Sequence, residues 1–345
     1  MKQLMIVCLL LIGLVLVVPS ILVVGFSDGD SASQSTYTEE GPVVSEEEVE
    51  EVWIEGAEDA AETVAVFRSE RSVVEHIPFE DYIVGVVAKE MPAEFELEAL
   101  KAQALTARTY IIQLMGVEEN LPLGADVTDT DLHQVFSNDE ELREQWGSEY
   151  DWKIARIREA VYATEGMVIT YDGYPIDALY YSTSNGLTEN SEEYWSNEYP
   201  YLRSVESPWD LESPRYLGHK EMSVGEFEEK LGISVAEHGI GQIVGRTTGG
   251  RVEKVVFGDK EFTGREIREE LLGLNSADFT WERRGDTIHI ETRGWGHGVG
   301  MSQYGAHGMA QEGHSFEEII HHYYQGVEIS EVNQVMSAMV AKESR

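Results

Sequence analysis

An uncharged, almost wholly apolar run from Leu4 to Phe26 is the strongest constraint on this chain. Its 23 residues would form a helix long enough to cross a bilayer core of about 30 Å, at about 1.5 Å per residue. A cleaved signal peptide has a shorter apolar core and a small-x-small site, which residues 19–24 do not offer. We therefore expect residues 4–26 to be an uncleaved transmembrane signal anchor. Because only Met1 and Lys2 carry positive charge before it, residues 1–3 should be cytoplasmic and the rest extracytoplasmic.

Charge sets the next segment apart from the rest. The chain has 25 basic and 64 acidic residues, which gives a formal net charge of −39. Residues 27–62 hold 13 carboxylates and no Lys or Arg, so residues 27–63 should form an acidic, disordered linker. The alternative is a docking arm for a partner. Nucleic acid binding is excluded, because no basic patch is present to neutralise phosphates.

The chain has a single cysteine, Cys8, which lies inside the apolar run. The exported part therefore has no disulfide and no thiol, so its hydrophobic core must stabilise it. A cysteine nucleophile and a zinc-thiolate site are both excluded. The histidines show no His-Glu-x-x-His or comparable ligand spacing, and we expect neither a metal site nor a cofactor.

Residues 64–330 are continuously patterned and should form one domain, followed by a tail at 331–345. Helical spacing of apolar residues predicts three helices, and turn and capping signals predict hairpins and shorter helices. The helices are expected at 78–90, 97–114 and 153–165, the hairpins at 168–171 with 176–181 and at 279–283 with 287–292, a further strand at 252–257, and capping boxes at Ser223 and Thr263. Because helices and hairpins mix without regular alternation, we predict an α+β fold rather than a doubly wound sheet.

Glu90 is the one carboxylate that continues the apolar stripe of the first predicted helix, after Val86 and Val87. Burial and the negative end of the helix dipole would both raise its pKa, and burial is the larger effect. A glutamate with a pKa near neutrality can act as a general acid. The alternative is an exposed helix end, or an ion pair with Lys89, Lys101 or Arg108.

Two further segments carry the polar and aromatic groups that sugars require. Residues 180–188 follow a strand and are rich in hydroxyls, and Glu193, Tyr194 and Trp195 come soon after. Residues 294–308 alternate glycines with Trp295 and His297, and such glycines let another group approach the backbone closely. Neither segment has the form of a nucleophile elbow, a Walker A loop or a dinucleotide fingerprint. An ordinary polar turn remains the alternative for residues 180–188.

These segments together resemble the stage II sporulation protein D family and its amidase-enhancer relatives. The resemblance rests on four motifs in order, over about residues 65–330. They are Glu90-Met91-Pro92 with Leu100-Lys101-Ala102-Gln103-Ala104, the Ser182-Thr183-Ser184-Asn185-Gly186 turn with Trp195, the Tyr199-Pro200-Tyr201-Leu202 stretch, and the run from Gly294 to Ala306.

The resemblance implies a membrane-anchored lytic transglycosylase, with residues 64–330 as its catalytic domain and a substrate groove formed by helices and hairpins. Such an enzyme cuts between N-acetylmuramic acid and N-acetylglucosamine in peptide-stripped glycan strands, leaving a 1,6-anhydro end. The family's catalytic acid falls on Glu90. Candidate residues for binding the sugar are Arg108, Tyr181, Ser182, Thr183, Asn185, Trp195, His297, Gln303 and Tyr304.

The resemblance also implies a place and partners. The expected location is the mother-cell membrane at the septum and the engulfing membrane, during endospore formation. The expected partners are the glycan strands, the sporulation amidase protein P and the multispanning protein M.

The sequence departs from the family pattern in two places. Some members carry zinc-binding cysteines in the stretch that corresponds to residues 130–136, where this chain keeps His133 but has no cysteine, so zinc should be absent. Many relatives have Gly-Gly where this chain has Asn185-Gly186, which puts the role of position 185 in question.

Two other functions stay open. The first is a non-catalytic scaffold that grips glycan and stimulates an amidase. The second is a hydrolase, which would need a second carboxylate from Glu94, Glu189 or Glu193.

Overall fold

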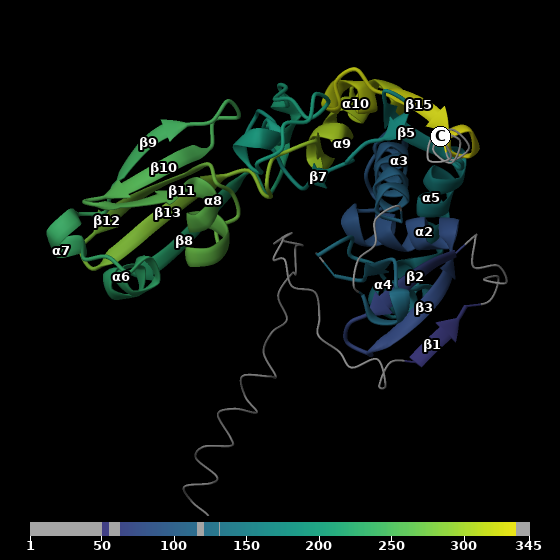
Figure 1. Ribbon diagram of the computed structural model, residues 1–345, viewed down its shortest axis with the longest axis horizontal. Coiled ribbons are helices and arrows are strands. Elements are labelled where there is room, and N and C mark those ends of the chain that lie inside the picture. The colour runs from purple at the N-terminus through teal and green to yellow at the C-terminus, as the bar shows by residue number, and fades with distance from the viewer. Residues whose placement is uncertain (1–49, 55–62, 116–120, 131, 336–345) are drawn as a thin grey trace, which may run out of the picture. The chain divides into compact units, whose positions relative to one another are not determined.

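The computed structural model of the chain describes residues 50–54, 63–115, 121–130 and 132–335. The predicted cytoplasmic residues and membrane anchor, and most of the predicted linker and tail, lie outside these ranges. No helix within the described ranges is long and apolar enough to cross a membrane. The described residues form mixed helices and mainly antiparallel strands, which confirms the α+β class (Figure 1).

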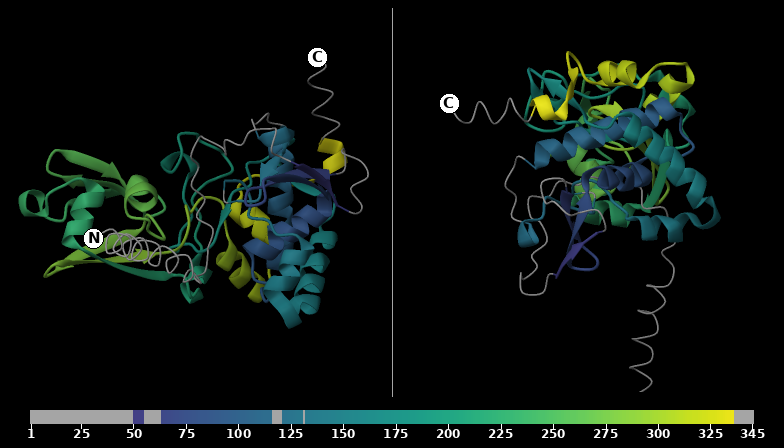
Figure 2. Two further views of the ribbon diagram at one scale, coloured as in Figure 1. Left: turned by 90° about the horizontal axis from the view of Figure 1, so that it is seen from below. Right: turned by 90° about the vertical axis from the view of Figure 1, so that its right-hand side faces the viewer.

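The first part of the fold is a group of helices beside a four-stranded sheet. The helices α2 (Phe79–Glu90), α3 (Leu97–Leu114) and α5 (Tyr150–Ala163) pack on one another and share one hydrophobic core. In both views of Figure 2 they lie together, in blue and teal. The sheet has the order β1-β3-β2-β4, with β1 (Glu50–Trp53), β2 (Thr63–Arg68), β3 (Val73–Pro78) and β4 (Val127–Thr128).

Helix α2 ends where the sequence predicts. Pro92 restricts the residue before it to extended geometry, and Met91 has φ −132° and ψ 133°. Glu90 is therefore the last helical residue. Helix α5 begins three residues earlier than predicted, at Tyr150, and an unpredicted helix, α4 (Asp139–Trp146), precedes it behind a capping box of Asn138 and Glu141.

The predicted hairpin at residues 168–181 forms only in part. Strand β5 (Met167–Tyr171) pairs with β6 (Tyr174–Pro175) across Asp172 and Gly173, both of which have positive φ. The chain then leaves this sheet. Strand β7 (Tyr180–Tyr181) pairs in parallel with β14 (Met301–Ser302) of the glycine-rich segment, so the prediction of one strand over 176–181 is wrong.

Residues 217–293 build a second hydrophobic core that the sequence did not predict. Two three-stranded sheets, β11-β10-β9 and β12-β13-β8, enclose it (green in Figure 1). Their elements are β8 (Leu217–Ser223), α6 (Val224–Leu231), α7 (Val235–His238), β9 (Gln242–Arg246), β10 (Val252–Phe257), β11 (Lys260–Thr263), α8 (Gly264–Glu266), β12 (Phe279–Arg284) and β13 (Thr287–Arg293). The predicted strand at 252–257 and hairpin at 279–292 are confirmed. Ser223 and Thr263 cap α6 and α8 as predicted.

The end of the chain returns to the first core. Helices α9 (Gln303–Gln311) and α10 (Phe316–Tyr323) pack on α3, and β15 (Glu328–Glu331) pairs with β5. Residues from both ends of the domain therefore meet around α2 and α3.

Candidate active site

Glu90 stands at the C-terminal end of α2 and keeps part of its surface open to solvent. Protein nevertheless crowds its carboxyl group, and this burial raises its pKa to about 7. Hydrogen bonds from the Val135 backbone, Gln303 and Tyr180, together with the charge of Lys89, oppose the rise but do not cancel it. Glu90 thus combines access for a ligand with a pKa at which both protonation states are populated near neutral pH.

A hydrogen-bonded set of neutral side chains surrounds this carboxyl group. Gln134 donates from Nε2 to the Tyr180 hydroxyl at 3.3 Å and accepts from the Tyr82 hydroxyl at Oε1, also at 3.3 Å. Gln303 donates from Nε2 to Oε1 of Gln103 at 3.4 Å. These residues come from α2, α3, the segment before α4, β7 and α9. Only Gln303 was predicted as a site residue, because no local pattern links the others to Glu90.

The glycines of residues 294–300 bring two stretches of this chain's own backbone together. Gly294, Gly296, Gly298 and Gly300 all have positive φ, which glycine adopts without strain. A Cβ at Gly300 would overlap the carbonyl of Leu179, and one at Gly294 would press on the backbone at 183–185. The close approach predicted from the glycines is present, and the approaching groups are residues 179–189 and, at Gly298, the side chain of Arg251.

His297 is buried in this loop and acts as a fixed neutral donor. Its Nδ1 accepts from the Val299 backbone N–H at 3.1 Å, so Nε2 must carry the proton that it shares with the Tyr180 carbonyl at 3.0 Å. Burial lowers its pKa to about 3. The rings of Tyr181, Tyr194 and Trp195 surround the imidazole. His297 therefore positions β7 rather than transferring a proton.

We expect His297 to stay neutral from pH 8 to pH 5. Because its folded pKa lies below the ordinary value of 6.5, the stability that it contributes is present above pH 6.5 and is lost as pH falls toward 3. Two-dimensional ¹H–¹⁵N spectra of the imidazole should show an unchanging Nε2–H tautomer over that range. Titration of His297 near pH 6.5 would contradict the assignment.

The other candidates for binding sugar lie in different surroundings. Thr183 is buried, pairs its backbone with Trp295 and places its hydroxyl 3.0 Å from Ser213 Oγ. Tyr181 is also buried. Ser182, Trp195 and Tyr304 keep partial exposure. Gln303 lowers the pKa of Glu90. The sugar contacts of all these residues, like the groove itself, stay predictions.

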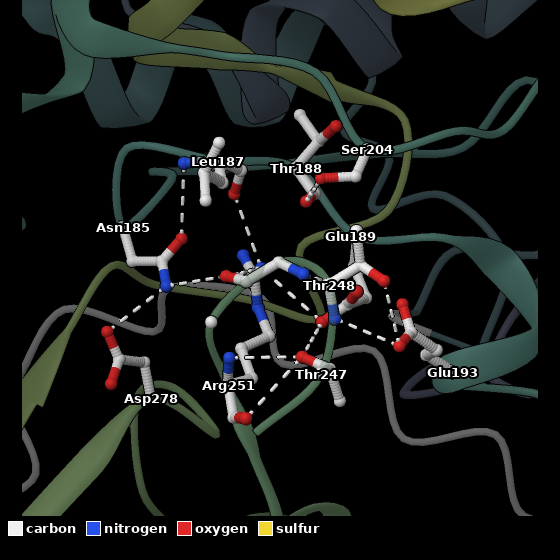
Figure 3. Close-up of polar contacts among 12 residues, drawn as sticks. Asn185, Leu187, Thr188, Glu189, Glu193, Ser204, Thr247, Thr248, Arg251 and Asp278 are labelled. Atoms are coloured by element: carbon white, nitrogen blue, oxygen red, sulfur yellow. Dashed lines mark hydrogen bonds and ion pairs between the residues drawn. The ribbon is translucent and has the colours of Figure 1, made fainter. Parts of the chain in front are cut away.

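The side chain of Asn185 is hydrogen-bonded to residues of the segment 217–293 (Figure 3). Its Nδ2 donates to the Gly249 carbonyl at 2.9 Å and to Asp278 Oδ2 at 3.1 Å. Nearby, Glu189 accepts from the Gly249 N–H and from the Thr247 hydroxyl. These contacts hold the turn at 247–251 against residues 185–193, which gives Asn185 a structural role.

Each of the three carboxylates considered for a hydrolase has interaction partners other than Glu90. Glu94 is exposed and pairs with Lys153 at 3.2 Å. Glu189 is buried 3.8 Å from Arg251, and Glu193 accepts from Thr248 (Figure 3). The interactions that set the pKa of Glu90 come from other groups.

Arg108 is fully buried and makes structural contacts. It forms a two-point ion pair with Glu80, at 3.0 Å from Nε and 2.7 Å from Nη2. The same guanidinium donates to the Thr164 hydroxyl and the Val161 carbonyl. It thus ties α3 to α2 and α5, and we do not retain it among the residues that would bind sugar.

Within the described residues no three His, Cys, Asp or Glu side chains are grouped to hold a metal ion. His133 shares its Nδ1 with the Thr128 backbone N–H and hydroxyl, at 3.1 and 2.9 Å.

Comparison with known proteins gives the class of this chain. Residues 68–171, which include Glu90, Gln103 and Gln134, match a family model described as a stage II sporulation protein. The chain is 45% identical to stage II sporulation protein D of Bacillus subtilis (strain 168), over 99% of this chain and 100% of that protein. It is 46% identical to the protein of the same name from Bacillus amyloliquefaciens, over 96% of each. The chain belongs to the stage II sporulation protein D family.

A more distant relative carries a different name. The amidase enhancer of Bacillus subtilis (strain 168) is 31% identical over 71% of this chain, which corresponds to 40% of that protein. The sequence shared by the two therefore includes most of this chain but less than half of the enhancer.

Proposed function

We propose that this chain is a lytic transglycosylase that cleaves the glycan strands of peptidoglycan during sporulation. The observation that carries the proposal is Glu90, a partly accessible carboxyl group whose pKa is raised to about 7 by burial. A general acid needs a pKa near the working pH, so that it is protonated when it acts and ionised afterwards.

One carboxyl group suffices for this reaction. Protonated Glu90 gives its proton to the glycosidic oxygen as the bond from that oxygen to the muramic acid anomeric carbon breaks. The 6-hydroxyl of the same muramic acid attacks that carbon and closes the 1,6-anhydro ring. The hydroxyl proton passes to the Glu90 carboxylate, which restores the acid without consuming water. A hydrolase would instead need a second carboxylate to act as nucleophile or to activate water.

The neutral residues around Glu90 fit both halves of this cycle. Tyr180 and Gln303 donate hydrogen bonds to its carboxylate form, which stabilises the state left after proton donation. Burial stabilises the protonated form before it. The balance of the two effects allows Glu90 to act first as acid and then as base.

The test is mass analysis of the products formed from peptide-free glycan strands by the full-length protein in detergent. We expect fragments with anhydro ends, one water lighter than hydrolysis products, and none from Glu90→Gln. The matched control is Glu94→Gln, which removes an exposed carboxyl group four residues away and should cleave normally. Ordinary reducing ends would contradict the transglycosylase and favour a hydrolase.

The second candidate function is a glycan-binding scaffold that stimulates a wall amidase. The name of the amidase enhancer relative favours it. A folded wild type that retains glycan and cuts none of it, alone or with the sporulation amidase, would favour the scaffold.

We also propose that the chain acts at the mother-cell membrane, held by residues 4–26, with protein P and protein M as partners. Limited proteolysis of sealed spheroplasts tests the topology. Digestion of residues 64–330 by external protease is expected, and protection of that domain would exclude the proposed orientation.

A further inference from the structure

Gln134 is a buried glutamine at the centre of the polar groups around Glu90. Its Nε2 lies 3.4 Å from the carbonyl oxygen of Ala107 in α3. Because a carbonyl oxygen can only accept, the amide nitrogen must face it, and the amide oxygen must face the Tyr82 hydroxyl. The orientation of this side chain is therefore fixed by its neighbours.

The fixed orientation of the Gln134 amide determines which atom donates in its hydrogen bond with Tyr180. Nε2 of Gln134 also donates to the hydroxyl oxygen of Tyr180. The hydroxyl oxygen of Tyr180 is an acceptor in that bond, so its own proton is free to point to the carboxyl group of Glu90, whose pKa Tyr180 lowers. The donors run in one direction, from Gln134 to Tyr180 to Glu90.

The segment that carries Gln134 is held in place from outside the site. Phe136 stacks on Tyr82 with ring centroids 5.3 Å apart, and a Cβ at Gly85 would overlap the Phe136 ring. Arg68 binds Asp129 before the segment at 2.9 Å and Glu141 after it at 2.7 Å. The segment is thus pinned on both sides of Gln134.

We propose that Gln134 is a positioning residue that aims the Tyr180 hydroxyl at Glu90. This proposal rests on the proposed function, since the orientation of the Tyr180 hydroxyl matters to catalysis only if Glu90 is the acid. Once Glu90 has given up its proton, an aimed hydroxyl stabilises the carboxylate at once. Without Gln134 the hydroxyl can rotate to other acceptors, and the carboxylate loses that donor.

Other titratable groups also act on Glu90, Tyr180 and Tyr82. Lys89 and the Tyr82 phenol interact with Glu90 from α2, and Tyr110 of α3 interacts with Tyr180. Asp126 and Asp129 act on Tyr82. The variants below leave all of these groups unchanged.

The experiment measures the protonation midpoint of Glu90 by ¹³C NMR of the full-length protein with labelled glutamate carboxyl groups. The resonance is assigned by its loss in Glu90→Gln, which is needed because burial also raises the pKa of Glu189. The variants are Gln134→Met, Tyr180→Phe and the double substitution. Gln311→Met, at an exposed position of α9, is the control for exchanging glutamine for methionine.

We expect Tyr180→Phe to raise the midpoint by roughly one pH unit or more, because a hydrogen bond to the charged form is lost. Gln134→Met should raise it in the same direction by a smaller amount, and Gln311→Met should not change it. The double substitution should match Tyr180→Phe alone, since Gln134 acts through the Tyr180 hydroxyl.

An unchanged midpoint in Gln134→Met, or shifts that add in the double substitution, would overturn the proposal. If Gln134→Met does not fold, Gln134→Asn, which keeps the amide on a shorter stem, carries the same test. NMR reports the protonation midpoint of Glu90 without turnover. Absence of glycan cleavage would therefore contradict the proposed function, while the effect of Gln134 on that midpoint could still be measured.

Discussion

Glu90→Gln is expected to lower glycan cleavage by ~10²–10⁴-fold, the usual contribution of a general acid, and to stabilise the folded protein at pH 8. The two effects have one cause. The site holds the carboxyl group in surroundings that favour its uncharged form, because burial raises its pKa. Glutamine is uncharged and has nearly the same shape, so it relieves the cost of the charge but cannot give a proton.

The sign of the stability effect follows from the pKa. In the folded protein the pKa of Glu90 is raised from its ordinary value of 4.5 to about 7. Its contribution to stability is therefore fully present below pH 4.5 and is lost as pH rises through 7. The full shift corresponds to ~3 kcal/mol. Because Glu90 keeps some exposure, we expect Glu90→Gln to gain ~1–3 kcal/mol at pH 8 and nothing at pH 4.5.

Thermal unfolding at the two pH values, together with cleavage of peptide-free glycan, measures both effects on the same samples. Glu94→Gln supplies the control, because Glu94 is exposed and its pair with Lys153 is worth little. A Glu90→Gln protein that cuts glycan at the wild-type rate would remove Glu90 from the mechanism. Equal stability changes at both pH values would show that its carboxyl group is not held in its uncharged form.

The raised pKa of Glu90 could be predicted from the sequence because its signal is local. The apolar positions of α2 recur every three or four residues, and a charged residue on that stripe stands out. Pro92 then fixes where the helix ends. Both facts lie within a window of about four helical turns, so neither depends on how distant segments pack.

The partners of Glu90 could not be predicted in the same way. Tyr180 reaches Glu90 only because β7 leaves the predicted hairpin and pairs with β14, in which Met301 lies opposite Tyr180. Gln134 reaches Tyr180 because Arg68 and Phe136 hold an irregular segment over α2. A polar residue in such a segment looks like any surface residue until its tertiary contacts are known.

The glycine-rich run shows an intermediate case. Alternating glycines correctly predict a close backbone approach near His297, because only glycine accepts the positive φ values found there. The sequence favoured a binding or catalytic role for this segment over a structural one, and spacing alone could not identify the group that approaches it. The structure places residues 179–189 there.

The second core shows a similar limit. Its hairpin and capping boxes carry local signals, and these predicted the elements correctly. Whether residues 217–293 share the first core or form their own depends on which apolar faces meet. In the structure, β8 and β13 pair with each other over their whole length, and residues 217–293 form their own core.

Arg108→Met is expected to destabilise the folded protein by ~3–5 kcal/mol, because it leaves a buried ion pair with one partner. Arg108 has no exposed side-chain surface, and Glu80 has 19%. The substitution also removes the donors to the Thr164 hydroxyl and the Val161 carbonyl, which lie inside the core. Arg108→Lys keeps the charge but not the two-point contact, so its cost should be intermediate.

The same variant decides between the structural role and the sugar contact predicted from the sequence. If Arg108 only ties α3 to α2 and α5, the molecules that remain folded below the melting transition should keep the wild-type KM for glycan. A residue that binds sugar would raise KM and leave the melting temperature nearly unchanged. Arg158→Met in α5 is the control, because Arg158 is 44% exposed and its 3.5 Å pair with Asp139 should contribute only ~0–1 kcal/mol. A raised KM in Arg108→Met without loss of stability would return Arg108 to the substrate-binding residues.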